Sequence, residues 1–346
     1  MSAPNISAYV PNFDDVEQAA NRLKGHVVQT KLLNSPVIDI MCGMEVWFKP
    51  ECLQKVGAFK YRGAFNRLSA MSPEERACGV VAYSSGNHAQ GVSRAAKELG
   101  MSAIIVMPKD APAVKVNGVK NDGAEIVIYD RLTENREQIA EDIAARDGRV
   151  VVPSYDDPFI IAGQGTTGLE IAQSGHDFDA LVTCIGGGGL CAGISLAMNV
   201  LLPKTKIYAA EPEFYNDHQQ SLTAGKRTPF GEAPPTLCDA LMTPIPGELT
   251  WQINSKSLSG VFGVSDRDCL MAMAVAKKEL GVELEPGGAV AMASVLTGKL
   301  SESLSESLSE NLSGKMPQKN AKIVVILSGG NVDPAVAKRA EDMFSL

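Results

Sequence analysis

The feature of this sequence that most restricts its fold is a regular alternation of short apolar runs with helical patterns. The apolar runs are rich in Val and Ile, are bounded by Gly, Pro, Asp or Ser, and cover residues 79–83, 103–107, 125–129, 149–153, 180–185, 206–210 and 322–327. Runs of this kind are typical of parallel strands that are buried on both faces. The helical patterns cover residues 90–99, 136–146, 165–173 and 266–280. The alternation predicts an α/β fold with open, twisted sheets.

At three of the expected strand ends the sequence becomes polar or glycine-rich. These segments read Ser84-Ser85-Gly86-Asn87-His88, Gly186-Gly187-Gly188-Gly189 and Ser328-Gly329-Gly330-Asn331. In open α/β sheets, ligands bind beyond the carboxyl ends of the strands. The three segments are therefore predicted to belong to a ligand site.

Four consecutive glycines, Gly186 to Gly189, follow one of these strands. Because glycine has no Cβ, several backbone N–H groups can approach one anion closely. A helix expected to begin near Leu190 would add its positive end. The dinucleotide pattern G-x-G-x-x-G is matched only loosely, so the glycines predict a compact phosphate site. A flexible turn is the alternative.

Lys60 lies in the segment Gly57-Ala-Phe-Lys-Tyr-Arg-Gly-Ala64, where most of its neighbours are small or apolar. A lysine at the beginning of a helix is usually a solvated surface residue. Partial burial would instead lower its pKa and make it a nucleophile toward an aldehyde. A nucleophilic lysine together with a phosphate site is the combination that pyridoxal phosphate requires.

Seven motifs occur in the same order as in a known family and span nearly the whole chain. They are GAFKYRGA around Lys60, SSGNHAQG from Ser84, AGQGT from Ala162, GGGGL from Gly186, EPEFYND from Glu211, EPGGA from Glu285 and SGGNVD from Ser328. By these motifs the chain resembles the fold-type-II pyridoxal-phosphate family of serine/threonine dehydratases, serine racemases and 3-hydroxyaspartate dehydratases. The resemblance implies a tryptophan-synthase-β-like fold with two open α/β sheets, and a homodimer. We expect a large domain of residues 1–78 and 153–346 and a small domain of residues 79–152.

The resemblance also implies how the cofactor would be held. Lys60 would bind pyridoxal phosphate as a Schiff base and then act as the general base on the substrate Cα. Phe59 would pack beside the pyridine ring, Asn87 would hydrogen-bond the 3-hydroxyl group, and Ser328 would contact the pyridine nitrogen. The backbone N–H groups of the segment from Gly186 to Leu190 would bind the phosphate.

The substrate is expected at the first of the three segments. By resemblance, its α-carboxylate would bind to Ser84, Ser85, Asn87 and His88. In the racemases the serine matching Ser85 also faces the cofactor opposite the lysine and can exchange a proton there; the alternative is that Ser85 only shapes the loop. An arginine matching Arg136 can meet a second carboxylate of the substrate. The alternative is that Arg136 pairs on the surface with Asp130 or Glu134.

The segment from Glu211 to Asp217 resembles the divalent-cation site of the same family. Glu211 and Asp217 would supply carboxylates and Tyr215 its backbone carbonyl, and such oxygen ligands suit Mg2+, Ca2+ or Mn2+. The alternative is an acidic loop without a metal. His88 and His218 are not expected to take part, because they do not lie at metal-ligand spacing.

Taken with the resemblance, these residues predict a pyridoxal-phosphate-dependent ammonia-lyase. It would eliminate water and ammonia from a small β-hydroxy amino acid (3-hydroxyaspartate, serine or threonine) and give a 2-oxo acid. One alternative is a serine or aspartate racemase with dehydratase side activity, although Asp239-Ala240 replaces the Asp-Gly usual in serine racemases. An alternative of another class is a non-catalytic nucleotide-binding protein with a Rossmann-like sheet.

Composition restricts the partners and the location. The net charge is -8 and no cluster of Lys and Arg occurs, which argues against nucleic acid as a partner. No apolar run reaches the roughly 20 residues of a membrane helix, and the N-terminus lacks the pattern of a signal peptide. The seven cysteines include no CxxC pair, so a cytoplasmic protein is expected. The Leu-Ser-Glu repeat of residues 300–312 predicts a surface helix, with a loop from Gly314 to Asn320.

Overall fold

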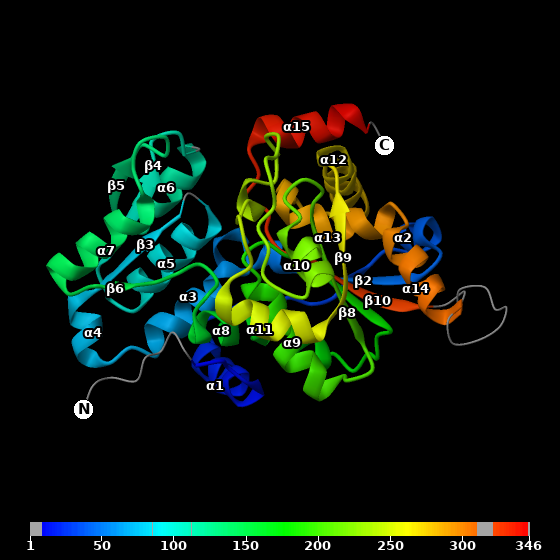
Figure 1. Ribbon diagram of the computed structural model, residues 1–346, viewed down its shortest axis with the longest axis horizontal. Helices are drawn as coiled ribbons and strands as arrows, with labels where there is room; N and C mark the ends of the chain where they lie inside the picture. Colours follow the sequence, from blue (N-terminus) through cyan, green and yellow to red (C-terminus); the bar gives the residue numbers. More distant parts are fainter. Residues whose placement is uncertain (1–8, 85, 112, 310–320, 345–346) are drawn as a thin grey trace.

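The computed structural model describes residues 9–84, 86–111, 113–309 and 321–344, and Figure 1 shows its ribbon. Ten strands in these residues form two separate open sheets, one of six strands and one of four. Helices cover both sheets (Figure 1). The predicted fold class, α/β with two open sheets, is confirmed.

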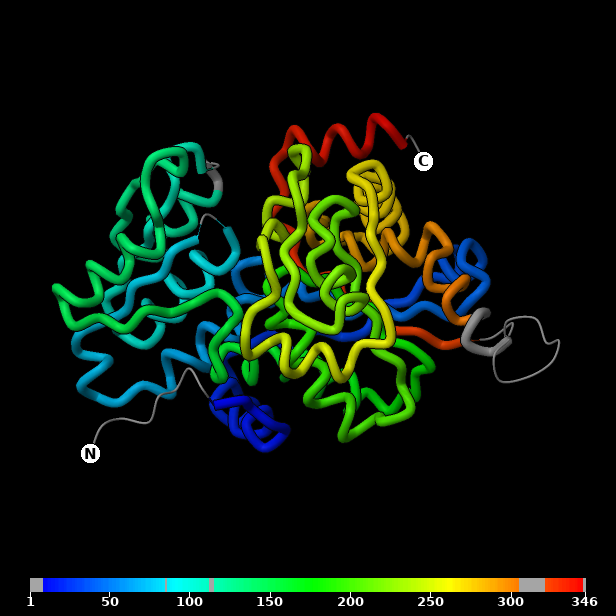
Figure 2. The backbone as a smooth tube through the Cα atoms, viewed as in Figure 1, coloured from blue at the N-terminus to red at the C-terminus, as the bar shows by residue number. Residues whose placement is uncertain are grey.

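The larger sheet has the strand order β1-β2-β10-β7-β8-β9. Its strands are β1 (Leu33–Asn34), β2 (Glu45–Pro50), β7 (Ala180–Cys184), β8 (Lys206–Pro212), β9 (Leu258–Val264) and β10 (Lys322–Leu327). Neighbouring strands are parallel except that the short β1 is antiparallel to β2. The sheet joins two distant parts of the chain, since β2 near one end pairs with β10 near the other (Figure 2).

Two groups of helices pack around the larger sheet (Figure 1). One group contains α1 (Phe13–Leu23), α8 (Pro158–Ala172), α9 (Gly189–Leu201) and α11 (Glu248–Ser257). The other contains α2 (Pro36–Cys42), α12 (Asp266–Val275), α13 (Pro286–Leu296), α14 (Lys299–Ser309) and α15 (Pro334–Met343). A further helix, α10 (Asp217–Ala224), packs beside β9. Short 3-10 turns are η2 (Glu51–Leu53), η3 (Lys55–Gly57) and η4 (Asp239–Leu241), and a π turn, η5 (Ala276–Leu280), extends α12.

The smaller sheet has the order β5-β4-β3-β6, and all its strands are parallel. Its elements are β3 (Val80–Tyr83), α5 (Asn87–Glu98), β4 (Ala103–Pro108), α6 (Ala113–Asn121), β5 (Glu125–Tyr129), α7 (Arg136–Asp147) and β6 (Val150–Val151). Alternate side chains of β3 enter different hydrophobic clusters: Val80 and Ala82 pack with residues of α5, whereas Val81 packs with residues of α7. Both faces are buried, which explains why β3 is apolar nearly throughout.

The connection between the sheets is made by α3 (Lys60–Ser69), which is followed by α4 (Pro73–Cys78). α3 packs on α5 of the smaller sheet and on α8 of the larger one. Arg62 in α3 is fully buried, and its guanidinium lies 2.7 Å from Glu51 and 2.7 Å from Glu170. These buried ion pairs fix α3, and with it Lys60, against the larger sheet.

All seven predicted strands are present, and the bounds of β5 and β10 match the prediction. Three strands, β1, β2 and β9, were not predicted. β2 was not recognised as an apolar run because it contains Lys49, which is buried and pairs with Glu170. β9 was not recognised because Ser259, Gly260 and Gly263 interrupt its apolar residues.

The Leu-Ser-Glu repeat does form a helix, α14, as far as Ser309. Its first leucine, Leu300, is fully buried in the main core, so the description of a surface helix holds only in part. Residues 310–320, which include the predicted loop from Gly314 to Asn320, lie outside the described part of the chain. Within the described part, no helix combines the length and apolar character needed to cross a membrane.

The strand orders place the ligand site. In the smaller sheet β3 lies between β4 and β6, and in the larger sheet β7 lies between β10 and β8. The strands that follow β3 and β7 in the chain extend the sheet on one side, to β4 and to β8. The strand on the other side, β6 or β10, comes later in the chain. Such a reversal of strand order opens a crevice at the carboxyl ends of the strands. Ser84 follows β3, Gly186 follows β7 and Ser328 follows β10. The three polar segments thus lie at the two switch points.

Candidate active site

Lys60 is the first residue of α3, and its amine donates a hydrogen bond to the carbonyl oxygen of Ser154 (2.7 Å). The residue as a whole keeps some exposed surface, but protein atoms surround the amine. This desolvation lowers the pKa of Lys60 to about 8. The amine also lies 5.2 Å from the centre of the Phe59 ring. Lys60 is therefore a buried amine that loses its proton at a much lower pH than an exposed lysine does.

The turn before Lys60 is attached to the end of β10. The Phe59 N–H donates to the carbonyl oxygen of Ser328 (3.2 Å), and Ala58 forms an isolated β-bridge with Gly329. The thiol of Cys184, at the end of β7, donates to the Ser328 hydroxyl oxygen (3.3 Å). Because Ser328 accepts this bond, its own hydroxyl proton remains free to be donated to a ligand.

The glycine turn is held from behind by α11. Thr250 Oγ1 donates to the carbonyl of Gly187 (2.6 Å), and Asn254 Nδ2 donates to the carbonyl of Gly188 (3.1 Å). In a trans peptide the N–H group points away from the C=O group, so the N–H groups of Gly188 and Gly189 point away from α11. The first N–H groups of α9, which begins at Gly189, add to them. The turn thus presents several backbone N–H groups as hydrogen-bond donors on the side away from α11.

Two of these glycines have no room for a side chain. A Cβ on Gly187 would lie 2.3 Å from the ring of Tyr155, and a Cβ on Gly188 would lie 2.6 Å from Asn254 Nδ2. Gly188 also has φ 95°, which side-chain-bearing residues rarely adopt. The close packing around the turn is what requires glycine here.

The segment after β3 begins α5. The first N–H groups of this helix, at Asn87 and His88, have no partner within the helix, which suits a carboxylate. The Ser84 hydroxyl accepts from the Gly86 N–H (3.2 Å) and so shapes the turn. The His88 ring is buried, and its Nε2 donates to the carbonyl of Val152 (2.9 Å).

Burial, and secondarily the charge of Lys60, lower the pKa of His88 to about 3. Its ring is therefore neutral, and only its backbone N–H is available to a substrate carboxylate. Ser85, which was predicted to have a catalytic role, lies outside the described residues.

Glu285 is a buried acid that was not assigned a role from the sequence. Its Oε1 accepts from Asn87 Nδ2, and Asn331 Nδ2 donates to Asn87 Oδ1 (2.8 Å). Its Oε2 has no hydrogen-bond partner among the described residues. Burial raises the pKa of Glu285 to about 7. The EPGGA motif contains this residue, but the motif alone gave no sign that the carboxyl group contacts Asn87.

Taken together, these groups fit pyridoxal phosphate. The donors from Gly188 onward match a phosphate, and the amine of Lys60 matches an aldehyde. The free hydroxyl proton of Ser328 matches an unprotonated pyridine nitrogen. The second Nδ2 hydrogen of Asn87 is available for the ring hydroxyl group.

Arg136 is the first residue of α7, and its guanidinium lies 5.6 Å from the centre of the Tyr83 ring at the end of β3. About half of the Arg136 side chain is exposed, and its ion pair with Glu137 is long (3.9 Å). Asp130 pairs instead with Lys109 (2.7 Å). The alternative of surface pairing with Asp130 or Glu134 therefore named the wrong partner, although Arg136 does lie partly in solvent.

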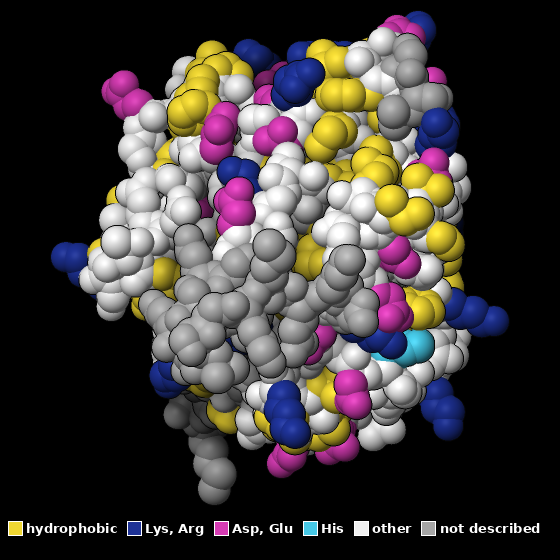
Figure 3. Space-filling view, turned by 90° about the vertical axis from the view of Figure 1, so that its right-hand side faces the viewer, with side chains coloured by type: hydrophobic (Ala, Val, Ile, Leu, Met, Phe, Trp, Pro, Cys, Tyr) yellow, Lys and Arg dark blue, Asp and Glu magenta, His cyan; other side chains and the backbone are white. Residues whose placement is uncertain are grey.

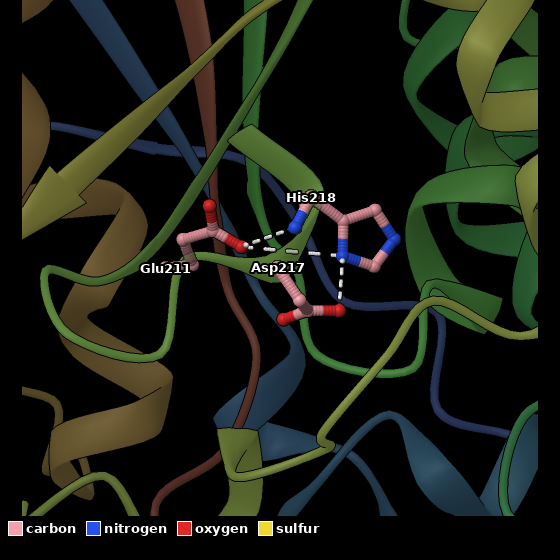
Figure 4. A group of neighbouring side chains, drawn as sticks. All are labelled: Glu211, Asp217 and His218. Atoms are coloured by element: carbon pink, nitrogen blue, oxygen red, sulfur yellow. Dashed lines mark hydrogen bonds and ion pairs between the residues drawn. The ribbon is translucent and has the colours of Figure 1, made fainter. Parts of the chain in front are cut away.

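A second cluster lies at the end of β8, where Glu211, Asp217 and His218 are all buried (Figure 4). One possible ligand atom from each lies within 4.8 Å of the others. His218 Nδ1 faces Asp217 Oδ2 at 3.3 Å, and Glu211 accepts from the backbone N–H groups of His218 and Gln219. The sequence spacing gave no reason to include His218, but the turn after β8 brings its ring to Glu211 and Asp217.

The third predicted ligand is the backbone carbonyl of Tyr215, which stays a prediction; the Tyr215 side chain contacts another part of the chain. Its hydroxyl donates to the carbonyl of Pro234 (2.9 Å). The two carboxylates predicted from the sequence do lie together, and the cluster can hold a divalent cation through them. A nitrogen ligand from His218 would widen the choice toward transition metals.

Comparisons with known proteins agree with this chemistry. The chain matches the model of the family described as pyridoxal-phosphate dependent enzyme over residues 23–329. It is 41% identical over 324 residues to L-threo-3-hydroxyaspartate ammonia-lyase of Saccharomyces cerevisiae, covering 94% of each chain. It is 38% identical over 324 residues to serine racemase of Schizosaccharomyces pombe, covering 94% of this chain and 95% of that one. The structure of maize serine racemase aligns with a TM-score of 0.88 at 36% identity, covering 97% of this chain and 98% of that one.

Proposed function

Because this chain belongs to the family of pyridoxal-phosphate-dependent enzymes, we propose that it is an ammonia-lyase that acts on 3-hydroxyaspartate. The resemblance recognised from seven motifs is confirmed, and so is the prediction of an enzyme. The alternative of a non-catalytic nucleotide-binding protein is therefore wrong. The substrates of this enzyme are small amino acids, as the names of the related enzymes indicate.

The observation that carries the proposal is the enclosed amine of Lys60 beside Ser328 and the glycine turn. Pyridoxal phosphate, when bound, supplies an electron sink for the charge that develops at the substrate Cα. The Lys60 amine takes the Cα proton, since a pKa of about 8 leaves part of it unprotonated near neutral pH. The N–H groups at the beginning of α5 hold the α-carboxylate.

The overall reaction balances as an elimination followed by hydrolysis. The Cα proton and the β-hydroxyl group leave as water, and a double bond forms between Cα and Cβ. The released enamine takes up one water, gives ammonia and becomes a 2-oxo acid. The Ser328 hydroxyl cannot transfer its proton fully to a pyridine nitrogen, so it favours prompt loss of the β-hydroxyl group over a long-lived carbanion.

The choice of substrate rests on the relative in Saccharomyces cerevisiae and on Arg136. Arginine binds carboxylates through a bidentate fork. Arg136 lies above Tyr83, one residue before the turn that would hold the α-carboxylate. We propose that it attracts the second carboxylate of 3-hydroxyaspartate. Serine and threonine lack this group.

Racemisation of serine is the second candidate, because the relative in Schizosaccharomyces pombe and the maize structure are serine racemases. Ser85 would be the proton donor on the face opposite Lys60. Chiral chromatography of serine after incubation with the enzyme measures this activity directly. Ser85→Ala should abolish racemisation and leave dehydration of 3-hydroxyaspartate measurable.

A divalent cation, Mg2+ first among Mg2+, Ca2+ and Mn2+, is also proposed for the cluster in Figure 4. The support is that Asp217 Oδ1 and His218 Nε2 are buried without hydrogen-bond partners among the described residues. A buried carboxylate needs a compensating charge. The cation would stabilise the turn after β8 and would not contact the reacting atoms.

Three further expectations remain proposals. A homodimer is supported by exposed apolar side chains of α2, chiefly Ile40 (83% exposed) and Met41 (55% exposed). The α2 helix lies on the right-hand side of Figure 1, the side that Figure 3 turns toward the viewer, where hydrophobic and charged side chains are mixed. The domain division at residues 79 and 152 fits the extent of the smaller sheet, and limited proteolysis would test it. The cytoplasm remains the proposed location, on the basis of the cysteine pattern.

The decisive experiment is an assay of the purified, cofactor-loaded enzyme with L-threo-3-hydroxyaspartate, serine and threonine. We expect release of a 2-oxo acid and of ammonia in equal amounts, with the highest kcat/KM for 3-hydroxyaspartate. Higher kcat/KM for serine or threonine, or racemisation without ammonia release, would overturn the proposal.

A further inference from the structure

Lys115 in α6 is a buried cation that the proposed reaction does not use. Its side chain is only 7% exposed, and its amine lies 2.7 Å from Asp239 Oδ2. Lys115 belongs to the smaller sheet's helices, whereas Asp239 begins η4 beside the larger sheet. The pair therefore bridges the two halves of the molecule.

The bridge lies directly over the site. The Lys115 amine is 3.8 Å from where a Cβ of Gly86 would lie, and Gly86 is the residue from which α5 begins. On the other side, Ala240 and Leu241 of η4 lie against Gly186 of the phosphate turn. The charge of Lys115 also acts on Glu285, where it opposes the effect of burial on the pKa. Lys115 thus faces the place where the substrate would lie.

We propose that Lys115 is a specificity-determining residue that binds the distal carboxylate of a dicarboxylic substrate. The inference rests on the proposed function and adds the group that distinguishes 3-hydroxyaspartate from serine. The two carboxylates of 3-hydroxyaspartate are attached to neighbouring carbons, Cα and Cβ. A cation next to the α-carboxylate turn is therefore within reach of the second one.

Asp239 supports this assignment, because it already presents a carboxylate to the same amine. In the absence of substrate it neutralises Lys115, whose charge would otherwise be buried alone. The Asp239 side chain is 48% exposed, so it can turn into solvent when a substrate carboxylate replaces it. The exchange leaves the amine paired at every stage.

Lys115 is better placed than Arg136 to discriminate between substrates. The Lys115 side chain is 7% exposed and that of Arg136 is 48% exposed. An interaction between charges is stronger where protein excludes water and is screened less by salt. Arg136 therefore attracts the dianionic substrate from solvent, and Lys115 binds its distal carboxylate and so distinguishes it from serine.

The first test compares Lys115→Met with Lys97→Met in the cofactor-loaded enzyme. Lys97 is the matched control, because it also pairs with an aspartate, Asp122 (3.3 Å), on the same sheet's helices but at the far end of α5. We expect Lys115→Met to lower kcat/KM for 3-hydroxyaspartate more than tenfold and to change that for serine less than threefold. Lys97→Met should change neither. Equal losses on both substrates in Lys115→Met would overturn the inference.

The second test separates a carboxylate receptor from a simple bridge between the sheets. Asp239→Asn removes the resting partner but leaves Lys115 in place. If Lys115 binds the substrate, this variant should lower KM for 3-hydroxyaspartate or leave it unchanged. If the pair only joins the two halves, both Asp239→Asn and Lys115→Met should reduce turnover of 3-hydroxyaspartate and of serine alike, and the inference fails.

A binding measurement keeps this inference separate from the proposed function. Malonate, a small dicarboxylate, should inhibit serine turnover much more strongly than acetate, and Lys115→Met should abolish the difference. If the wild-type enzyme does not act on 3-hydroxyaspartate but malonate binding depends on Lys115, only the proposed substrate is wrong. If malonate inhibits wild type and Lys115→Met equally, Lys115 is no receptor. Lys115→Gln repeats the test should Lys115→Met fail to fold.

Discussion

At the level of single residues, the chemistry depends on how burial changes proton affinity. An amine attacks an aldehyde only when it is unprotonated. Burial lowers the pKa of Lys60 to about 8, so the neutral fraction of this amine rises through that pH and is nearly complete above it. We expect the rate at which cofactor-free protein takes up pyridoxal phosphate to rise with pH, to reach half its maximum near pH 8 and to level off about one pH unit higher. Stopped-flow absorbance measures this rate.

The same experiment identifies the residue. After borohydride reduction, mass spectrometry should find the cofactor on the peptide that contains Lys60, and Lys60→Ala should carry none. Lys55, five residues earlier and paired with Glu98, is the internal comparison. A rate that still climbs near pH 10, or a label on Lys55, would contradict the assignment.

Glu285 gives a second prediction for a single residue, and here burial raises the pKa instead of lowering it. Burial raises its pKa from 4.5 to about 7, so the folded state holds a proton that the unfolded state has released. Stability is therefore lost as pH rises between these values, by up to about 3 kcal/mol. Glu285→Gln cannot ionise, so its advantage over wild type should be small at pH 5 and should grow by pH 8. Urea unfolding of cofactor-free protein measures it.

The exposed neighbour Glu283 provides the control for this measurement, because Glu283→Gln should change stability equally at both pH values. An advantage of Glu285→Gln that does not depend on pH would show that the Glu285 carboxyl group ionises normally in the folded protein.

At the level of elements, the phosphate turn depends on α11 as much as on its own glycines. Gly188→Ala would place a Cβ 2.6 Å from Asn254 Nδ2, at φ 95°, and would disturb the bonds that hold the turn. We expect the dissociation constant for pyridoxal phosphate to rise by about fivefold to about a hundredfold, as strain of about 1–3 kcal/mol implies. Equilibrium titration by absorbance measures it.

Gly175→Ala is the matched control for the phosphate turn. Gly175 has a similar φ of 80°, but nothing lies within 4 Å of its Cβ position. This substitution should lower the melting temperature without changing cofactor affinity. Equal affinity losses in both variants would mean that the effect of Gly188→Ala comes from backbone strain elsewhere in the fold.

The turn between β8 and α10 carries the metal prediction. A chelator should lower the melting temperature by several degrees, and Mg2+, Ca2+ or Mn2+ should restore it, because Asp217 would lose its compensating charge. Asp217→Asn should remove the response. Glu213→Gln, on the exposed side of the same turn, should keep it. A wild-type protein that ignores the chelator and contains no metal by elemental analysis would count against the site.

At the level of the whole molecule, the sequence was most informative where local pattern and final position agree. β3 and β10 are buried on both faces, so their apolar runs predict them directly. The polar segments after them were found because a strand end is a local feature. The contact of Glu285 with Asn87 and the bridge between Lys115 and Asp239 join residues that are more than 100 positions apart in the chain. No local pattern contains such contacts, so they required the fold.

Charge at the mouth of the site is also a property of the whole molecule, because it reaches beyond direct contact. Arg136 is about half exposed, so its attraction for a dianionic substrate is screened by salt, whereas that of the enclosed Lys115 is screened less. We expect Arg136→Ala to lower kcat/KM for 3-hydroxyaspartate about tenfold at low ionic strength, and much less at about 0.5 M salt, where the Debye length is only a few ångströms. The loss caused by Lys115→Met should persist at both. Serine, which has no net charge, should show little effect in either variant. A loss in Arg136→Ala that does not change with salt would place Arg136 in direct contact with the substrate, and no loss would leave it on the surface.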